Sequence, residues 1–345
     1  MEDRVADLLD ALAEGPVVCA EGYLFECERR GYLQAGAFVP EVVLDHPEVV
    51  EELHREFVHA GSDVVEAFTY YGHREKLRVI GKEDILEPLN RQALSIAAKV
   101  ARQSGTLLAG NVCNTNVFEP GAAAAERAVR SAFAEQVGWA AEAEVDFIIA
   151  ETFSWAGEAL LALEAIRAAG LPAVVTFAVH RDGRMRDGIG PEEACRRAEQ
   201  AGAAVVGLNC IRGPRTMLPL LAPIRAAVSC PVAALPVPYR TTEDQPSMQA
   251  LRDPARGGTQ AFPTGLDPFT CTREELGKFA AAALDLGVGY LGVCCGAGPH
   301  HIRAVAEAAG KTPPSSRYSP DMSKHSFLGS AAGITASYQE YAPNL

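Results

Sequence analysis

The chain has 345 residues, of which 48% are hydrophobic and 22% charged, a balance typical of a globular protein with a sizeable core rather than a disordered one. Its formal net charge of −13 repels phosphate backbones, and no Lys/Arg cluster overrides this charge locally, which excludes nucleic acid as an expected partner. No apolar run reaches the ~20 residues of a membrane span, so no membrane partner is expected. The acidic segment 1–15 is typical of an amphipathic helix rather than a signal peptide, which favours a cytoplasmic location.

Short β-rich apolar runs alternate along the chain with longer segments of helical periodicity, as in repeated βα units around a parallel sheet. The expected strands are 17–21, 63–70, 107–112, 146–153, 173–179, 204–210, 231–237 and 290–295. Helices between them have recognisable starts at Pro47, at Pro191 and at a capping box formed by Thr272 and Glu275. Glycines that follow a helical run and precede a strand mark their ends: Gly61, Gly170, Gly202, Gly287 and Gly310.

Eight such units with no strand left over predict an α/β fold, a single closed (β/α)8 TIM barrel over residues 1–311, in preference to an open doubly wound sheet. The segment 239–269 is too long for an ordinary βα connection and is expected to be either a functional lid or disordered. Residues 312–345 lack clear periodicity and are expected to form a short C-terminal arm or a loose tail.

In barrels of this type, active sites form at the C-terminal ends of the strands. Cys210 ends the sixth expected strand in VVGLNC, and Cys294 and Cys295 end the eighth in YLGVCCG. Three thiols from two nearby strand ends can converge on one point, which fits a soft tetrahedral Zn²⁺ site with three protein ligands and one open position. Because side chains alternate along a strand, Cys294 and Cys295 can share this site only if the chain bends locally.

The chain contains nine cysteines, an odd number that fits poorly with full disulfide pairing. In a reducing compartment, cysteines are more often metal ligands, nucleophiles or small buried hydrophobes. Outside the trio, packing is the expected role of Cys19, Cys27, Cys113, Cys195, Cys230 and Cys271.

These thiol segments carry a family resemblance. GLNC at 207–210 and GVCCGAGPHHIRAVAE at 292–307 resemble the signature of the homocysteine S-methyltransferases, and the chain is most similar to their betaine-dependent branch. The likeness includes ERRGYLQAG at 28–36, HPEVVEELHREFVHAGSDV at 46–64 and FPTGLDP at 262–268, and it runs from about residue 15 to residue 309. It implies a zinc-dependent enzyme that moves a methyl group from glycine betaine, or a related onium compound, to homocysteine and forms methionine.

The implied chemistry agrees with the residue types. Coordination to zinc deprotonates a thiol near neutral pH, so the open position would take the homocysteine sulfur for direct in-line displacement. A methyl donor must carry a positive charge, so that a neutral molecule leaves, and this predicts an aromatic cage. The aromatic candidates near strand ends are Phe38, Tyr70, Tyr71, Phe153 and Trp155.

The resemblance implies Tyr71 as a donor-site residue and Glu151 as the partner of the homocysteine amino group, and these two are the candidate catalytic residues. The candidate substrate-binding residues are these two together with Glu21, Phe38, Tyr70 and Thr152. Several positions depart from the betaine branch. Ala20 replaces an aspartate and is followed by Glu21, Phe38 replaces a tryptophan, and Thr152 replaces an aromatic. Either Glu21 takes over amine binding from a shifted register, or this part of the site differs.

Three alternatives stay open. The donor can be a sulfonium such as S-methylmethionine or dimethylsulfoniopropionate, because both donor classes are cations. The replaced aspartate keeps open a non-catalytic zinc barrel that binds homocysteine without turnover, and a barrel whose thiols merely pack is the third. The betaine branch associates through a C-terminal arm, which implies a homodimer or higher homo-oligomer, although the tail is shorter here.

Overall fold

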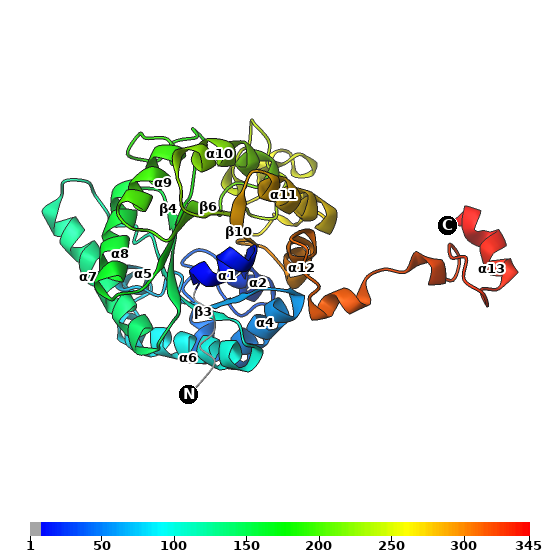
Figure 1. The fold of residues 1–345 in the computed structure, drawn as a ribbon, viewed down its shortest axis with the longest axis horizontal. Helices are drawn as coiled ribbons and strands as arrows, with labels where there is room; N and C mark the ends of the chain where they lie inside the picture. The colour runs from blue at the N-terminus through cyan, green and yellow to red at the C-terminus, as the bar shows by residue number, and fades with distance from the viewer. Residues whose placement is uncertain (1–7) are drawn as a thin grey trace.

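The computed structural model describes residues 8–345, and its centre is a closed barrel of eight parallel strands. The strands are β1 (Val17–Ala20), β2 (Val64–Glu66), β3 (Leu107–Cys113), β4 (Phe147–Phe153), β5 (Ala173–Phe177), β6 (Val205–Asn209), β7 (Val232–Leu235) and β10 (Val288–Val293). They follow the order β1-β10-β7-β6-β5-β4-β3-β2, and β2 pairs with β1 to close the barrel. The predicted (β/α)8 barrel is confirmed, and helices surround the strands in Figure 1.

The barrel helices are α1 (Leu8–Glu14), α2 (Tyr23–Arg29), α3 (Val42–Asp45), α4 (Pro47–Ala60), α5 (Arg74–Val79), α6 (Leu86–Ser104), α7 (Ala123–Glu142), α8 (Ala156–Ala168), α9 (Pro191–Gln200), α10 (Pro214–Ala227), α11 (Arg273–Asp285) and α12 (Pro299–Ala308). Of the helix expected over 1–15, residues 1–7 lie outside the described residues, and α1 covers most of the rest. None of the helices within residues 8–345 combines the length and the apolar character that a bilayer span requires.

The predicted helix boundaries are confirmed by the backbone. Pro47 and Pro191 are the first residues of α4 and α9. Before α11, the hydroxyl of Thr272 accepts from the amide of Glu275 at 3.2 Å, and the Glu275 carboxylate accepts from the amide of Thr272 at 2.7 Å. The five predicted stop glycines all have positive φ, which side chains disfavour: 109° at Gly61, 75° at Gly170, 99° at Gly202, 82° at Gly287 and 80° at Gly310.

Several strands end earlier than the sequence pattern predicts, most clearly the second. Its expected range was 63–70, but β2 ends at Glu66. Beyond it the amide of Thr69 donates to the carbonyl of Ala67 at 2.7 Å, so the chain turns instead of extending the ladder. The apolar pattern continues because residues 67–69 are buried in this turn.

All residues of β1 to β7 are buried, as expected for parallel strands whose two faces are covered by helices and by the barrel interior. Four of these strand residues nevertheless carry strongly polar groups, and each lies towards the C-terminal end of its strand. They are Glu66 in β2, Asn111 in β3, Glu151 in β4 and Asn209 in β6. The C-terminal end of the barrel is therefore polar inside.

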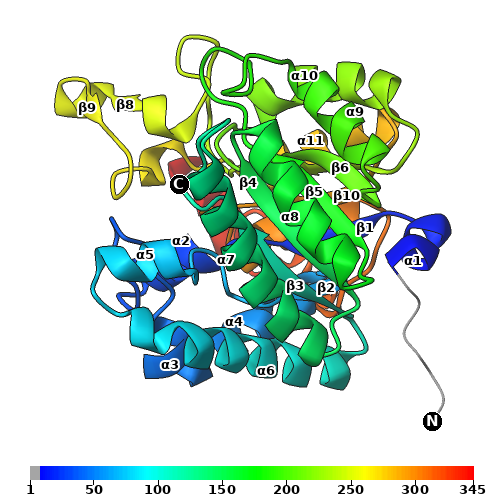
Figure 2. The same ribbon diagram turned by 90° about the vertical axis from the view of Figure 1, so that its left-hand side faces the viewer.

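The long segment 239–269 is an ordered insertion, which excludes the disordered alternative. It contains 3-10 turns at Met248–Ala250, Pro254–Arg256 and Asp267–Phe269, and a hairpin of β8 (Arg252–Asp253) and β9 (Thr259–Gln260). The amide of Met248 donates to the carbonyl of Ile211 at 2.8 Å, which ties the segment to the end of β6. Figure 2 shows the hairpin projecting from the barrel at the end opposite α1.

The C-terminal residues extend away from the barrel in Figure 1. They form 3-10 turns at Pro314–Tyr318, Met322–Lys324 and Ala342–Asn344 and a short helix, α13 (Ala336–Tyr341). This segment exposes several large apolar side chains: Tyr318, Met322, Leu328, Tyr338, Tyr341 and Leu345.

The close approach of β10 to β1 generates a prediction about stability. A Cβ atom at Gly292 would lie 2.0 Å from the carbonyl oxygen of Cys19, its partner in β1. Gly292→Ala is therefore expected to lower the free energy of unfolding by about 1–3 kcal/mol, as overpacking does elsewhere, measured by urea unfolding. Gly289→Ala in the same strand is the control, because its Cβ would meet nothing closer than Leu12 Cδ2 at 3.5 Å. Equal losses in the two variants would contradict this account.

Candidate active site at the C-terminal end of the barrel

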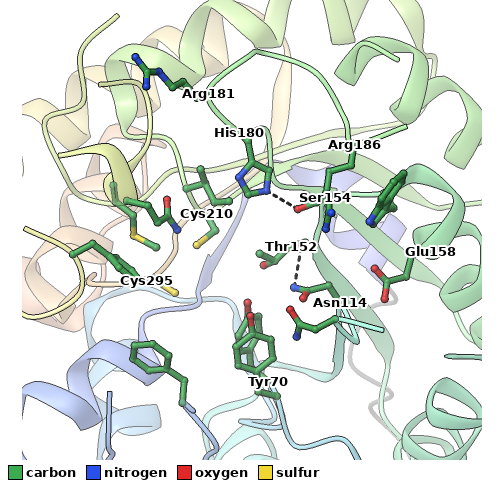
Figure 3. A pocket seen from close by; sticks show the side chains of 18 of the residues that line it. Tyr70, Asn114, Thr152, Ser154, Glu158, His180, Arg181, Arg186, Cys210 and Cys295 are labelled. Atoms are coloured by element: carbon green, nitrogen blue, oxygen red, sulfur yellow. Dashed lines mark hydrogen bonds between the residues drawn. The ribbon is translucent and has the colours of Figure 1, made fainter. Parts of the chain in front are cut away.

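A pocket of about 600 Å³ lies at the C-terminal end of the barrel, where the strand ends meet. Its wall includes the aromatic residues Phe38, Tyr70, Tyr71, Phe118, Trp155 and Phe262, the polar residues Asn114, Thr152, Ser154, Glu158, His180 and Arg186, and the thiols of Cys210 and Cys295. Figure 3 shows Cys210 and Cys295 together on one side of this pocket.

The three predicted thiols do converge. The sulfur atoms of Cys210, Cys294 and Cys295 all lie within 4.8 Å of one another, and all three residues are buried. Cys210 follows β6 and its amide donates to the carbonyl of Leu235 at 2.9 Å, while Cys294 follows β10 and its amide donates to the carbonyl of Pro236 at 2.9 Å. Both β10 cysteines lie beyond the end of the strand, so strand alternation no longer separates them, and the predicted bend is confirmed.

The turn that carries Cys294 and Cys295 is held from outside the barrel by Arg29 of α2. The guanidinium of Arg29 donates to the carbonyl of Gly296 at 3.0 Å and to the hydroxyl of Tyr239 at 2.8 Å. Gly296 has φ 93°, and a Cβ atom there would lie 2.1 Å from the Tyr239 hydroxyl oxygen. Only glycine fits at this position. The hydrogen bonds of Arg29 connect the cysteine turn, α2 and the long segment 239–269.

The three thiols do not share their charge equally. Hydrogen bonds from Cys294 and Cys295 hold the pKa of the Cys210 thiol well below its usual range. Burial raises the pKa of Cys294, and the hydrogen bond to Cys210 raises the pKa of Cys295. In the protein alone, one thiolate is thus stabilised by two thiols, and a bound cation is the group that would let all three ionise.

The donor set fits a metal of the zinc type. All nine cysteines are free, so none of the three sulfurs is used in a disulfide. Three buried sulfur donors are soft ligands, which suit zinc and not magnesium or calcium. Cys210, Cys294 and Cys295 are the residues that can hold such an ion.

Beside the thiols lies a cluster of three buried carboxylates: Glu21, Glu66 and Glu151, which are 6%, 3% and 3% exposed. The amide nitrogen of Asn111 donates to Glu66 at 2.5 Å and to Glu151 at 2.6 Å. The amide nitrogen of Asn209 donates to Glu151 at 2.5 Å and lies 3.2 Å from Glu21. A small cavity runs between these carboxylates and Cys294 and Cys295, and it is lined by no Lys, Arg or His of the described chain.

The charge of this cluster is uncompensated. Burial and the neighbouring Glu151 raise the pKa of Glu21, and burial raises the pKa of Glu66 in the same way. Burial, followed by the charge of Cys210, raises the pKa of Glu151 to about 7. One oxygen of Glu21 has no hydrogen-bond partner among the described residues. Such a cavity attracts a small cationic group, because a cation restores the favourable ionisation of the carboxylates.

Sequence reasoning placed Glu21 and Glu151 in the candidate site but missed Glu66, Asn111 and Asn209. The structure brings Glu21 to Glu151 and Cys294, with ligand atoms within 4.8 Å of one another, and brings Glu66 equally close to Glu21. A carboxylate inside the apolar run VVEAF was the available signal, since such a residue is rarely buried without a partner.

The aromatic candidates divide into two groups. Phe38, Tyr70, Tyr71 and Trp155 line the large pocket, whereas Phe153 packs in the core against Phe133 with ring centroids 6.0 Å apart. The rings of Tyr70 and Tyr71 lie side by side at 4.3 Å. Lys76 Nζ lies 4.0 Å from the centroid of the Tyr71 ring, so part of this ring already faces a cation of the protein.

Backbone strain concentrates at this pocket. Six of its lining residues have positive φ although they are not glycine: Phe38, Tyr71, Asn116, Thr152, Cys210 and Ile211, with φ between 56° and 65°. Such conformations cost on the order of 1–3 kcal/mol each and persist where the surrounding structure holds them for a function. The pocket is therefore the candidate active site on backbone as well as side-chain grounds.

Comparison with known proteins shows the family of this chain. A family model described as homocysteine S-methyltransferase matches residues 24–309, which includes the whole set of barrel strands after β1. The chain belongs to the homocysteine S-methyltransferase family. It is thus an enzyme of the methyltransferase class with small-molecule substrates, and the family predicted from the thiol motifs is confirmed.

Individual members of the family show how far the similarity extends. Betaine–homocysteine S-methyltransferase 1 of Mus musculus is 35% identical over 333 residues, which cover 94% of this chain and 79% of the mouse protein. S-methylmethionine–homocysteine S-methyltransferase BHMT2 of Rattus norvegicus is 34% identical over 332 residues, which cover 94% of this chain and 86% of the rat protein.

A solved structure supports the fold. The metallated form of the homocysteine methyltransferase MmuM from Escherichia coli superposes with a TM-score of 0.68 at 18% sequence identity, covering 87% of this chain and 99% of that one.

The raised pKa of Glu151 generates a prediction about this family member without metal. Between pH 4.5 and about 7 the folded state keeps a proton that the unfolded state releases, so Glu151 makes stability fall as the pH rises through this range. Glu151→Gln removes this pH dependence of the free energy of unfolding, which is on the order of 3 kcal/mol across the range. We therefore expect the free energy of unfolding of the variant, minus that of wild type, to be larger at pH 8 than at pH 5. Urea unfolding of metal-free protein measures both values.

The control is Glu52→Gln, which changes an exposed carboxylate of α4. Comparing each variant with wild type at both pH values cancels the contribution of other groups, including the buried histidines. A constant difference between wild type and Glu151→Gln across this range would show that the carboxylate is not held protonated.

Proposed function

We propose that this enzyme transfers a methyl group from glycine betaine, or a related onium donor, to homocysteine and forms methionine, with Zn²⁺ as its cofactor. The convergence of the Cys210, Cys294 and Cys295 sulfurs within 4.8 Å, at the strand ends of a barrel, carries the proposal. The adjoining acidic cavity and the aromatic pocket offer separate places for the acceptor and the donor.

Cys210, Cys294 and Cys295 would hold the zinc ion. Bound there, zinc would act as a Lewis acid that keeps the thiol of homocysteine deprotonated at neutral pH. Sulfur ligands and the absence of any redox change in methyl transfer favour zinc over a redox-active metal.

The acidic cavity would orient the acceptor. Glu151 and Glu21 would accept hydrogen bonds from the ammonium group of homocysteine, and both lie beside Cys294, so the amino group and the thiol of one small molecule reach their partners together. Thr152 supports Glu151, because its hydroxyl donates to the Glu151 carboxylate at 3.0 Å. Charge-assisted hydrogen bonds in such a water-poor cavity are stronger than in solution.

The aromatic wall would bind the donor. The ring faces of Phe38, Tyr70 and Tyr71 and the hydroxyl oxygens of the two tyrosines would attract an onium cation. Holding both substrates in line makes the displacement effectively unimolecular, and the donor leaves as a neutral molecule. Tyr71 also adjoins the region of the thiols, since the charge of Cys210 contributes to its raised pKa of about 12, which is due mainly to burial.

A sulfonium donor is the second candidate. Phe38 and Thr152 give this pocket a smaller aromatic surface than a tryptophan and a second aromatic would, and the rat relative named above is described as using S-methylmethionine. Rates of methionine formation with glycine betaine, S-methylmethionine and dimethylsulfoniopropionate separate the two donor classes.

Removal of one thiol tests the metal site. Cys294→Ala is expected to lower bound zinc from one per chain to well below one and to abolish methionine formation, because two remaining thiolates leave the site open. Zinc is measured by elemental analysis of purified protein and activity by product formation. The matched control is Cys230→Ala, which removes a half-buried thiol just before β7, away from the C-terminal rim.

Chelation of the wild-type enzyme should have the same effect as Cys294→Ala, and added zinc should restore activity. Full activity in metal-free protein would refute the mechanism. Saturable homocysteine binding to the zinc-loaded protein without turnover of any onium donor would instead favour a non-catalytic barrel.

Loss of an aromatic ring tests the donor site. Tyr71→Leu is expected to raise the KM for the donor about 5- to 30-fold, because a desolvated cation–π contact contributes about 1–2 kcal/mol. The KM for homocysteine should change little. Tyr318→Leu, at an exposed tyrosine 69% accessible in the C-terminal segment, is the control. An unchanged donor KM in Tyr71→Leu would remove this ring from the donor site.

A further inference from the structure

The loop between β5 and α9 brings positive charge to the donor pocket of a strongly acidic protein. Over residues 180–187 it carries His180, Arg181, Arg184 and Arg186 against Asp182 and Asp187. Five residues of this loop line the pocket: His180, Arg181, Asp182, Arg184 and Arg186. Figure 3 shows Arg186 on the side of the pocket opposite Cys210 and Cys295, with Thr152 between them.

Contacts on both sides of Arg186 fix its position in the loop. Its amide donates to the carbonyl of Ser154 at 2.8 Å. Met185 before it is buried, and the carboxylate of Asp187 after it accepts from the amides of Ala156 and Gly157 at 3.0 and 3.3 Å, at the start of α8. The loop therefore holds Arg186 against the pocket wall.

The side chain of Arg186 lies on an aromatic ring of that wall. Its guanidinium carbon is 4.8 Å from the centroid of the Trp155 ring. Stacking of this kind uses the flat face of a guanidinium and leaves the N–H groups at its edge available for hydrogen bonds to a planar anion.

No carboxylate of the protein takes up these N–H groups. Among residues 8–345, the ion pairs within 4.0 Å do not include Arg186, and no side-chain hydrogen bond of Arg186 occurs. Glu158 is the acidic residue whose ionisation Arg186 affects, but its Oε1 atom already accepts from the amide and the hydroxyl of Thr115 at 2.7 and 2.6 Å. On the other side, Nε2 of His180 lies 2.7 Å from the hydroxyl of Ser154, which adds polar groups to the same wall.

An unpaired guanidinium in this pocket conflicts with a simple cationic donor. An onium centre must approach the thiols, and a second cation in a partly desolvated pocket repels it. The conflict disappears if the donor also carries an anion that faces Arg186, and the opposite placement of Arg186 and the thiols then directs the methyl group towards the sulfur.

We propose that Arg186 binds a carboxylate of the methyl donor, so that the enzyme selects zwitterionic onium carboxylates over onium compounds without an acidic group. The inference rests on the proposed function, whose donor class it narrows. Glycine betaine, dimethylsulfoniopropionate and S-methylmethionine all belong to this class, whereas choline does not. Arg186 is thereby a specificity-determining residue of the donor site.

The test compares each donor acid with a neutral analogue. Zinc-loaded full-length enzyme at saturating homocysteine is assayed for methionine formation with the three onium carboxylates, and then with the carboxamide of the best of them. Wild type is expected to prefer the acid by about 10- to 100-fold in kcat/KM, the range of one charge-assisted hydrogen-bonded pair.

Arg186→Gln should lose this preference because its kcat/KM for the acid falls about 10- to 100-fold while its kcat/KM for the carboxamide changes less than about threefold. Arg186→Lys, which keeps the charge without the planar fork, should retain part of the preference. The matched control is Arg127→Gln, which removes one positive charge from the exposed face of the neighbouring helix α7.

The outcomes separate this inference from the proposed function. A preference for the acid that is the same in Arg186→Gln and wild type would overturn the proposed role of Arg186 in binding the donor carboxylate. Equal wild-type turnover of acid and carboxamide would overturn it as well. Equal loss with both donors in Arg186→Gln and Arg186→Lys would mark a structural role only and also overturn it. No methionine from any of these donors in the wild-type enzyme would contradict the proposed function itself.

Discussion

Uncompensated negative charge at one end of the barrel is the constraint on which the rest of this structure depends. Three carboxylates and three thiols are buried together there. No Lys, Arg or His of the described residues lines the small cavity between the carboxylates and Cys294 and Cys295. Burying such groups without cations is costly, and in the protein alone the pKa values of the three carboxylates and of the Cys294 and Cys295 thiols are raised, whereas that of Cys210 is lowered. A metal on the thiols and an ammonium group among the carboxylates relieve this cost together, which links cofactor binding to substrate recognition.

The barrel creates this concentration of charge because closure of parallel strands directs every C-terminal end to the same rim. Residues that are distant in the sequence thereby become neighbours: Asn209 Nδ2 lies 3.2 Å from a Glu21 oxygen across 188 positions of the chain. The backbone at this rim is held in left-handed conformations at Cys210 and Thr152, and Arg29 secures the cysteine turn from the outside. Rigid surroundings of this kind keep reactive groups in place before substrates bind.

The aromatic pocket and the acidic cavity beside it suit different chemical groups. The acidic cavity suits a small cation that comes with a thiol, whereas the aromatic wall suits a larger and poorly hydrated cation. The basic residues of the loop 180–187 are the exception to the negative potential of the site. The position of Arg186 opposite the thiols gives the pocket a polarity along its length. A zwitterionic donor matches that polarity in only one orientation, so charge complementarity contributes to positioning the methyl group as well as to affinity.

The sequence by itself determined the features that depend on neighbouring residues. Hydrophobic alternation, the first-turn prolines and the stop glycines predicted eight βα units, and the place of Cys210, Cys294 and Cys295 within their strands predicted the thiol site. Tertiary structure alone decided which side chains meet. Glu66 joined the acidic cavity, Phe153 went to the core while Trp155 faced the pocket, and Arg186 stacked on Trp155 without an ion pair to a carboxylate. Burial and electrostatic pairing depend on barrel closure between distant segments, which local patterns do not encode.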